Sequence, residues 1–390
     1  MGILNRMPIK SIMIIAGEAS GDVHGAKLAH SIKNRSKDTF LFGVGGIAMK
    51  TEGVRILVDI KTLSVMGITE VLAKLPSIYR AMTTVKKALN RLKPNLLILI
   101  DFPDFNFHVA AAAKKLGIPV LYYISPQIWA WRQKRVHKIK RLVDHMAVIL
   151  PFEAAFYRKH HVPVTFVGHP LLDGIMPAPD RLPATTHIKE PVIGLIPGSR
   201  EKEVTTLLPV MLQAAKIIKR TLPTSRFMVS CAESINPDLV STIVSHYAST
   251  FEIEIIKGSI GKIFKQSRMV VAASGTVTLE AALYGMPTVI IYKVSPLSYW
   301  IGKRLIKVKY IGIANLIAQK ELQPELIQDD ASPQAIAAAV TGMINDPERL
   351  RKNEKELIGI RDLLGGTGAS DRVAGIALDL IRRPVFRRST

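Results

Sequence analysis

Short apolar segments alternate with helix-like segments along almost the whole chain of 390 residues. In the first part these segments are rich in Val, Ile and Leu without polar alternation, which is typical of strands buried on both faces of a parallel sheet. Strands are predicted at residues 11–17, 39–45, 54–58, 95–101, 119–125, 145–150 and 164–168, and helices at 21–35, 77–92 and 106–116.

The alternation restarts after a segment rich in proline and polar residues. Strands are predicted at 191–198, 226–232, 251–257, 268–274 and 288–292, helices at 204–220, 236–247 and 275–284, and helical structure from about 332. Two consecutive βαβ arrays predict an α/β protein with two Rossmann-like, doubly wound domains that face each other across a cleft. We expect an N-terminal domain over 1–175, a linker over 176–190, a C-terminal domain over 191–365, and a C-terminal helical segment over 366–390 that could return to the first domain.

Charge is unevenly distributed along this basic chain, which has 53 Lys and Arg against 31 Asp and Glu. The stretches 105–143 and 281–320 contain no acidic residue. Aromatic rings beside cations suit either base stacking or the lipid headgroup layer, so the charge leaves nucleic acid and an anionic membrane open as partners. The interface candidates are Arg132, Lys134, Arg135 and Arg304, with Trp129, Trp131, Tyr299 and Trp300 among them.

Several features indicate a cytosolic protein. The N-terminus carries no recognisable targeting segment, and no apolar run approaches the ~18 residues that span a bilayer. Cys231 is the single cysteine, which excludes a disulfide framework and a cysteine-rich metal site. We expect Cys231 to be a small buried residue.

The first domain offers a carboxylate at the end of its most hydrophobic strand. Asp101 should emerge among apolar neighbours, where desolvation raises its pKa and makes it a better proton acceptor. Asp104 is expected to cap the following helix. The Gly17–Asp22 turn should place Glu18, Ser20 and Gly21 at the cleft, although a tight turn without a binding role is the alternative. His24 is expected to be a surface or packing residue.

The second domain offers two phosphate-binding turns. Ser199 and Arg200 follow a predicted strand, and an arginine there suits a phosphate. The alternative is a surface arginine paired with Glu201 or Glu203. In the other turn, Ser274, Gly275 and Thr276 open a helix, whose backbone amides and dipole favour a diphosphate. Glu280 could accept hydrogen bonds from ribose hydroxyls.

Nine motifs together resemble the lipid-A-disaccharide synthase family, and the resemblance covers nearly the whole chain. The motifs are GEASGD (17–22), VMGITEVL (65–72), DFPDFN (101–106), SPQIWAWRQKR (125–135), PFEAAFY (151–157), GHPLLD (168–173), PGSREKE (197–203), SGTVTLEAAL (274–283) and IANLIA (313–318). The resemblance implies a GT-B type, inverting glycosyltransferase. It would transfer 2,3-diacylglucosamine from its UDP derivative to 2,3-diacylglucosamine 1-phosphate, giving the β-1,6-linked disaccharide 1-phosphate and UDP.

The resemblance also implies roles for individual residues. Asp101 becomes the general base, with Glu18, Ser20 and Gly21 in the cleft. The UDP-binding residues become Ser199, Arg200, Ser274, Gly275, Thr276, Glu280 and Asn315. No DxD-type acidic pair lies near the nucleotide motif, so we expect no metal and no cofactor.

An apolar stripe at helical spacing precedes the Asp101 strand and comprises Met66, Ile68, Val71, Leu72 and Leu75. Core packing is the usual explanation of such a stripe, whereas the resemblance implies an exposed element that meets the membrane and acyl chains. Monotopic binding needs no transmembrane helix. We therefore expect a peripheral protein on the inner face of the cytoplasmic membrane, with anionic lipid and both acylated glucosamines as partners. The basic clusters would serve this lipid and the acceptor phosphate, and a homodimer is possible.

Other functions fit the sequence less well. A UDP-N-acetylglucosamine 2-epimerase or a peptidoglycan-type glucosaminyltransferase shares the two-domain layout but uses non-acylated substrates. A nucleic-acid-binding protein explains the charge but gives Asp101 and the SGTVTLE segment no purpose. An NAD-dependent oxidoreductase is disfavoured because the GxGxxG motif is missing.

Overall fold

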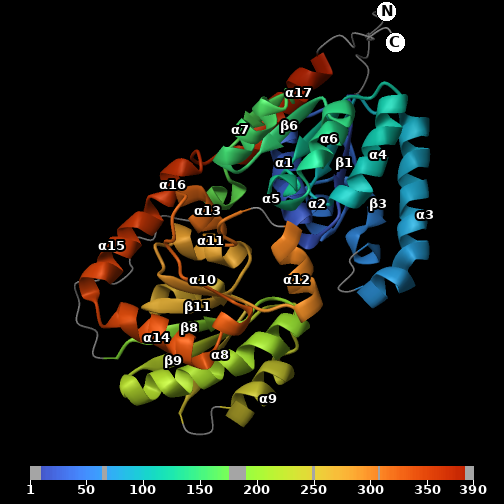
Figure 1. Ribbon diagram of the computed structural model, residues 1–390. Coiled ribbons are helices and arrows are strands. Elements are labelled where there is room, and N and C mark those ends of the chain that lie inside the picture. The colour runs from blue at the N-terminus through green and yellow to red at the C-terminus, as the bar shows by residue number, and fades with distance from the viewer. Residues whose placement is uncertain (1–9, 64–67, 175–189, 248–250, 306–307, 383–390) are drawn as a thin grey trace, which may run out of the picture. The chain divides into compact units, whose positions relative to one another are not determined.

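The computed structural model describes residues 10–63, 68–174, 190–247, 251–305 and 308–382 (Figure 1). The chain divides into two compact units. Unit 1 comprises Met1–Asp173 and Leu364–Thr390, and unit 2 comprises Gly174–Leu363. Residues 176–189 of the predicted linker lie outside the described residues.

Unit 1 is built on a parallel sheet with the strand order β3-β2-β1-β4-β5-β6-β7. The order reverses between β1 and β4, and the pairing of Ala16 with Ile100 brings the carboxyl ends of these two strands together. The strands are β1 (Ser11–Ala16), β2 (Phe40–Gly45), β3 (Arg55–Asp59), β4 (Leu96–Ile100), β5 (Val120–Tyr123), β6 (His145–Val148) and β7 (Val164–Phe166).

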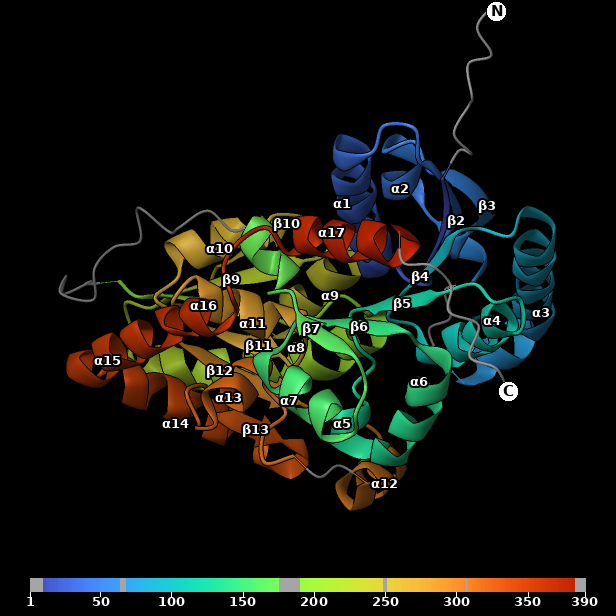
Figure 2. The same cartoon turned by 90° about the horizontal axis from the view of Figure 1, so that it is seen from above.

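Helices cover both faces of this sheet (Figure 2). One face carries α1 (Ala19–Arg35), α2 (Ile47–Thr51) and α17 (Ala369–Arg382). The other carries α3 (Ile68–Leu92), α4 (Pro103–Lys115), α6 (Val136–Leu142) and α7 (Pro151–Lys159). Successive strand residues point to opposite faces. Ile12 and Ile14 therefore pack in one core and Met13 and Ile15 in the other, which explains why the strands read as unbroken apolar runs.

The last helix belongs to unit 1, although it follows unit 2 in the chain. Val373 and Ala377 of α17 are fully buried in the core that α1 also lines. Arg35 of α1 pairs with Asp371, with 3.0 Å between Nε and Oδ1. Arg372 donates to the carbonyl oxygen of Val167 at 2.8 Å. These contacts attach the end of the chain to the first sheet.

Two histidines of unit 1 are largely withdrawn from water: His24 in α1 is half-buried and His169 is buried. The pKa of His24 is lowered to about 4 by burial and, to a smaller extent, by Lys27. The pKa of His169 is lowered to about 3, mainly by burial and then by His24. Both side chains are therefore neutral at pH 7, as expected for packing histidines.

Unit 2 repeats the plan with the parallel order β10-β9-β8-β11-β12-β13. The strands are β8 (Val192–Ile196), β9 (Arg226–Cys231), β10 (Ile253–Lys257), β11 (Met269–Ala273), β12 (Thr288–Tyr292) and β13 (Glu325–Ile327). Side chains of α8 (Glu201–Thr221), α9 (Pro237–Tyr247) and α14 (Pro333–Ile344) fill the core on one face. Those of α10 (Ile260–Gln266) and α11 (Thr276–Leu283) fill the core on the other.

The remaining helices are short or peripheral. They are α5 (Ile128–Trp131), α12 (Pro296–Leu305), α13 (Ile313–Ala318), α15 (Pro347–Ile358) and α16 (Ile360–Leu363), with 3-10 turns η1 (Ile60–Thr62), η2 (Gln133–Arg135), η3 (Pro170–Asp173) and η4 (Gln328–Asp330). No helix in the described ranges is long and apolar enough to cross a membrane.

Candidate functional site

Asp101 lies in an unusual turn at the carboxyl end of β4. Asp101 and Phe102 have φ angles of 45° and 48°, and α4 begins at Pro103. Two consecutive non-glycine residues in the left-handed region are rare. Such a conformation costs energy and persists only where its surroundings hold it in place.

The Asp101 carboxyl group is partly buried, and its pKa is raised to about 6. Burial is the largest cause, the negative charge of Glu18 adds to it, and a hydrogen bond from the Phe102 backbone opposes it. At pH 7 the group is still mostly ionised, yet it holds a proton more readily than an ordinary carboxylate. It can therefore act as a proton acceptor near neutral pH.

The Gly17–Asp22 turn lies beside Asp101 because β1 and β4 are neighbours. Glu18 is the exposed residue before α1, Ser20 is exposed in its first turn, and Gly21 is buried. A methyl group on Gly17 would lie 2.1 Å from the ring of Phe102, so only glycine leaves room for this ring. The structure thus places Glu18 close enough to raise the pKa of Asp101, with Ser20 and Gly21 in the same turn.

Asp22, the last residue of this turn, contacts the start of α2 and was not among the predicted site residues. Its buried carboxylate accepts hydrogen bonds from the backbone N–H groups of Gly46, Ala48 and Met49, at 2.6, 2.9 and 3.1 Å. The first turn of α2 is thereby fixed against α1. The final acidic residue of GEASGD was the signal that could have indicated this role.

The prediction that Asp104 caps α4 is wrong. Phe102 occupies the N-cap position and makes no side-chain cap hydrogen bond. Asp104 lies inside the helix, its side chain is 80% exposed, and its Oδ1 pairs with Nη1 of Arg135 at 3.0 Å. The helix starts earlier than predicted because the left-handed pair Asp101–Phe102 makes the turn.

The basic segment after β5 is only partly the aromatic surface that we expected. Arg132 stacks on exposed Trp131, with its Cζ 3.9 Å from the ring centroid, and Lys134 is exposed. Trp129 is instead buried and donates from Nε1 to Oε1 of Glu153 at 3.0 Å. Trp129 therefore belongs to the core and is not available for an interface.

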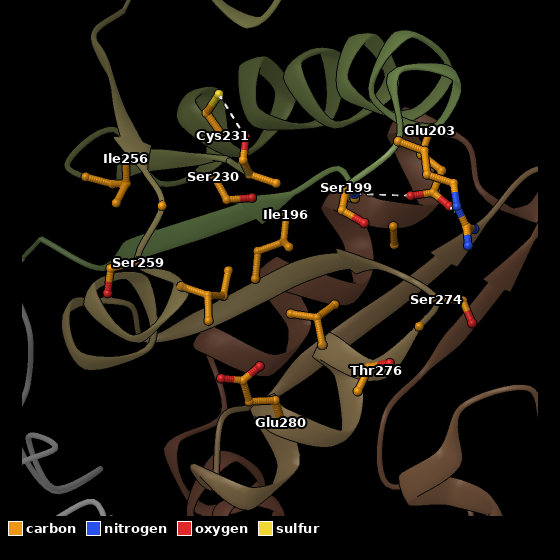
Figure 3. A pocket seen from close by; sticks show the side chains of 18 residues that line it. Ile196, Ser199, Glu203, Ser230, Cys231, Ile256, Ser259, Ser274, Thr276 and Glu280 are labelled. Carbon is orange, nitrogen blue, oxygen red and sulfur yellow. Dashed lines mark hydrogen bonds and ion pairs between the residues drawn. The ribbon is translucent and has the colours of Figure 1, made fainter. Parts of the chain in front are cut away.

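Unit 2 contains a pocket of about 340 Å³ at the carboxyl ends of β8 and β11, where the strand order reverses (Figure 3). This volume is within the range of small-molecule sites, and ligands of open α/β sheets bind at such reversals. Ser199 and Glu203 lie on one side of the pocket and Thr276 and Glu280 on the other. The lining also includes Arg200, Ser274, Gly275, Cys231, Ile256 and Gly258.

Glu203 organises the first of the two turns that the sequence predicts to bind phosphate. From the sequence, Glu203 was expected only as an alternative partner of Arg200. Its Oε1 accepts from Nη1 of Arg200 at 2.9 Å, and its Oε2 accepts from the Ser199 backbone at 3.2 Å. Gly198 has φ +112°, and a methyl group there would lie 2.3 Å from Glu203 Oε2. The arginine is thus held at the rim of the pocket and remains largely exposed.

The second turn places the start of α11 at the pocket. Gly275 precedes α11 without a side-chain cap, and nothing lies within 4 Å of the position of a methyl group on it. The first amides of a helix have no partner within the helix, so Thr276 can present its amide to an anion. Burial raises the pKa of Glu280, which lines the same pocket.

Asn315 does not join this pocket. Its buried Nδ2 donates to the carbonyl oxygen of Gln323 and to Oε1 of Glu325, both at 2.7 Å. Its Oδ1 accepts from the backbone N–H groups of Leu322 and Gln323 at 2.8 and 2.9 Å. These contacts show that Asn315 fixes the segment before β13. Its contact with UDP stays a prediction.

The predicted apolar stripe is only partly described. Met66 lies outside the described residues, and Ile68, Val71 and Leu72 fall in α3 with side chains that are also outside them. Leu75 is 50% exposed, and Tyr79 one turn later is 74% exposed. In unit 2, Arg304 stacks on Trp300, with its Cζ 5.0 Å from the ring centroid, and Trp300 is 60% exposed.

No group of three or more His, Cys, Asp or Glu side chains in the described ranges is placed to hold a metal ion. Because ions can also be held by fewer protein ligands together with a substrate, independence from divalent cations stays a prediction.

Two parallel Rossmann-like units with a pocket at a strand reversal define the GT-B fold of nucleotide-sugar glycosyltransferases. Two solved structures have the same fold. UDP-GlcNAc 2-epimerase from Neisseria meningitidis, bound to UDP-GlcNAc, matches with a TM-score of 0.66 and 13% sequence identity, and the match covers 95% of this chain and 100% of that one. MurG from Acinetobacter baumannii matches with a TM-score of 0.61 and 15% sequence identity, and the match covers 95% of this chain and 99% of that one.

The family model described as Lipid-A-disaccharide synthetase matches residues 12–374. The lipid-A-disaccharide synthase of Geobacter metallireducens is 45% identical over 379 residues, which cover 96% of this chain and 98% of the relative. The chain therefore belongs to the lipid-A-disaccharide synthase family and is a glycosyltransferase.

The Glu18→Gln variant should lower the pKa of Asp101 below the wild-type value of about 6. Removing the neighbouring negative charge favours the ionised form of Asp101, whereas burial continues to disfavour it. The titration should be followed through the carboxyl carbon of Asp101 by nuclear magnetic resonance. An unchanged or raised pKa would show that Glu18 does not act on Asp101 electrostatically.

Proposed function

We propose that this protein transfers 2,3-diacylglucosamine from UDP-2,3-diacylglucosamine to 2,3-diacylglucosamine 1-phosphate. The products are the β-1,6-linked disaccharide 1-phosphate and UDP. Family membership over nearly the whole chain supports this choice of substrates. The observation that carries the chemistry is the partly buried Asp101, whose raised pKa suits a base at neutral pH.

The reaction is a single displacement with inversion. Asp101 accepts the proton of the acceptor 6-hydroxyl as its oxygen attacks the anomeric carbon of the donor. A new C–O bond forms there, the bond to the β-phosphate oxygen of UDP breaks, and that oxygen keeps the electron pair. Arg200 and the amides at the start of α11 stabilise the negative charge that develops on UDP. Turnover should therefore fall as the pH drops below about 6.

The donor site comprises Ser199, Arg200, Ser274, Gly275, Thr276 and Glu280 around the pocket of unit 2. The phosphates would meet Arg200 and the start of α11, and Glu280 would accept hydrogen bonds from the ribose. Glu18, Ser20 and Gly21 would border the acceptor beside Asp101. Epimerase activity is not favoured, because the Neisseria meningitidis epimerase shares the fold at only 13% identity.

The protein would work at the inner face of the cytoplasmic membrane. Exposed Leu75 and Tyr79 on α3 provide apolar groups, and exposed Trp131 and Trp300 each stack with an arginine. Aromatic and cationic side chains of this kind favour the headgroup region of anionic lipid. The basic clusters that include Arg132, Lys134, Arg135 and Arg304 would also attract the acceptor phosphate. A homodimer stays a prediction.

Replacing the proposed base should abolish turnover without affecting donor binding. In the Asp101→Asn variant, kcat should fall by at least ~100-fold, because general-base catalysis contributes about that much or more. The test is thin-layer separation of products formed from both acylated glucosamine substrates, with UDP-sugar binding measured separately. The matched control is Asp104→Asn, an exposed carboxylate three residues away. Near-normal rates in Asp101→Asn would refute the proposed base.

Removing the rim arginine should weaken donor binding. The Kd of UDP in Arg200→Gln should rise roughly 10- to 100-fold, because hydrogen bonds to charged groups contribute about 1.5–3 kcal/mol. Isothermal titration calorimetry measures it directly. Arg220→Gln provides the control, since Arg220 is an exposed arginine on the same helix α8. Equal affinity in both variants would place the phosphates elsewhere.

A charge on the exposed face of α3 should weaken membrane binding. Leu75→Glu should pellet less with anionic phospholipid vesicles than wild type, because a carboxylate is disfavoured in apolar surroundings and repelled by anionic lipid. Leu363→Glu is the control at similar exposure, 48% against 50% for Leu75. If both variants bind vesicles as wild type does, α3 does not contact the membrane through Leu75.

A further inference from the structure

Two buried side chains donate hydrogen bonds to one backbone atom of the candidate base. Nδ2 of Asn106 and the hydroxyl of Tyr122 each lie 2.6 Å from the carbonyl oxygen of Asp101. Nδ2 of Asn106 also lies 3.4 Å from the carbonyl oxygen of Ile100. Asn106 and Tyr122 are both fully buried. Hydrogen bonds in such apolar surroundings are stronger than in water.

Asn106 is poorly explained as an ordinary core residue. Its Oδ1 is buried without a hydrogen-bond partner among the described residues, which costs free energy that an apolar side chain of similar size would avoid. Only its Nδ2 group is used, and this group is directed to the end of β4. The residue therefore stabilises the Asp101 turn at a cost to the core.

The turn itself needs such support. Asp101 and Phe102 are both in the left-handed region, and the ring of Phe102 fills the space that the missing side chain of Gly17 leaves. The ring of Phe105 lies next to it, with 5.5 Å between the centroids. If the donors to the Asp101 carbonyl were lost, the peptide group could rotate, and the carboxyl group of Asp101 would change direction with it.

We infer that Asn106 and Tyr122 are positioning residues that hold the left-handed turn and thereby direct the carboxylate of Asp101 toward the acceptor hydroxyl. The inference rests on the proposed function only for the role of Asp101 as a base. The support of the turn by two buried donors does not depend on that role, so the two can be tested separately.

Tyr122→Phe removes one donor and little volume. Its control is Tyr157→Phe, because Tyr157 is a fully buried tyrosine in the same core whose hydroxyl bonds to Ser125 instead, at 2.6 Å. Both variants should fold, with similar losses in melting temperature. We expect kcat of Tyr122→Phe to fall on the order of tenfold to 100-fold at unchanged KM for the donor, and kcat of Tyr157→Phe to stay near wild type.

A direct readout on Asp101 separates this inference from the proposed function. Nuclear magnetic resonance titration of the Asp101 carboxyl group should give a pKa of about 6 in wild type and a lower pKa in Tyr122→Phe, because a loosened turn exposes the carboxylate to water. Asn106→Leu, which removes the other donor, should lower it as well. An unchanged Asp101 pKa in both variants would overturn the inference, even if Asp101→Asn is inactive.

The double variant shows whether Tyr122 acts through Asp101. In the Asp101→Asn background, Tyr122→Phe should reduce the residual rate no further, because effects of residues that act as a unit are not additive. An undiminished tenfold loss in that background would mean that Tyr122 acts elsewhere and would also overturn the inference. Near-normal turnover of Asp101→Asn would refute the proposed base, whereas the titration would still test the support of the turn.

Discussion

The pairing of parallel strands at the two points where strand order reverses is the constraint on which both candidate sites depend. Residues that follow neighbouring parallel strands emerge at the same edge of a sheet. The pairing of Ala16 with Ile100 puts Glu18 beside Asp101 in unit 1. The pairing of β8 with β11 does the same for the turns that line the pocket in unit 2. The sites are thus consequences of register, and each is held by a sheet whose core is apolar on both faces.

Sequence patterns predicted the strands, the longer helices and the fold class, because these depend on the local composition of the chain. Apolar segments located β1 to β12. The central strands such as β1, β4 and β11 are unbroken apolar runs because they are buried on both faces, whereas the edge strand β10 contains Glu254. The pattern missed β13 and the short helix α2, which are too brief to show a period. It also gave no prediction for other short helices, among them α6, α7, α10 and α12. The family resemblance and the apolar environment of its strand both indicated Asp101. The predicted fold class, an α/β protein of the GT-B type, is confirmed by the two parallel sheets and by the comparisons with solved structures.

Contacts between residues distant in sequence could not be predicted in this way. Nothing local shows that Tyr122 donates to the Asp101 carbonyl, 21 residues earlier, or that Asp22 accepts from Gly46. Asp104 was predicted to cap α4, because the sequence gives no sign that Asp101 and Phe102 adopt left-handed conformations and that the helix begins before Asp104. The motif that includes Asn315 gave no sign that its amide group holds the chain around Gln323, and its contact with UDP stays a prediction. In each case the contacts seen in the structure join residues that local sequence patterns do not connect.

Burial of the carboxyl group suits Asp101 to its proposed role as a proton acceptor, but it also makes the conformation of the turn costly in free energy. Burial raises the pKa of Asp101 toward neutrality. Desolvation of the carboxylate and strain in the turn both favour a rotation that would expose the carboxylate to water. The surrounding residues oppose that rotation: Gly17 admits the Phe102 ring, and two buried donors hold the carbonyl. A proton acceptor at this position therefore needs rigid structural support, and the sheet edge between β1 and β4 supplies it. The proposed donor pocket has a different requirement, because its proposed phosphate ligands are the amides at the start of α11 and the largely exposed Arg200, which Glu203 holds at the rim.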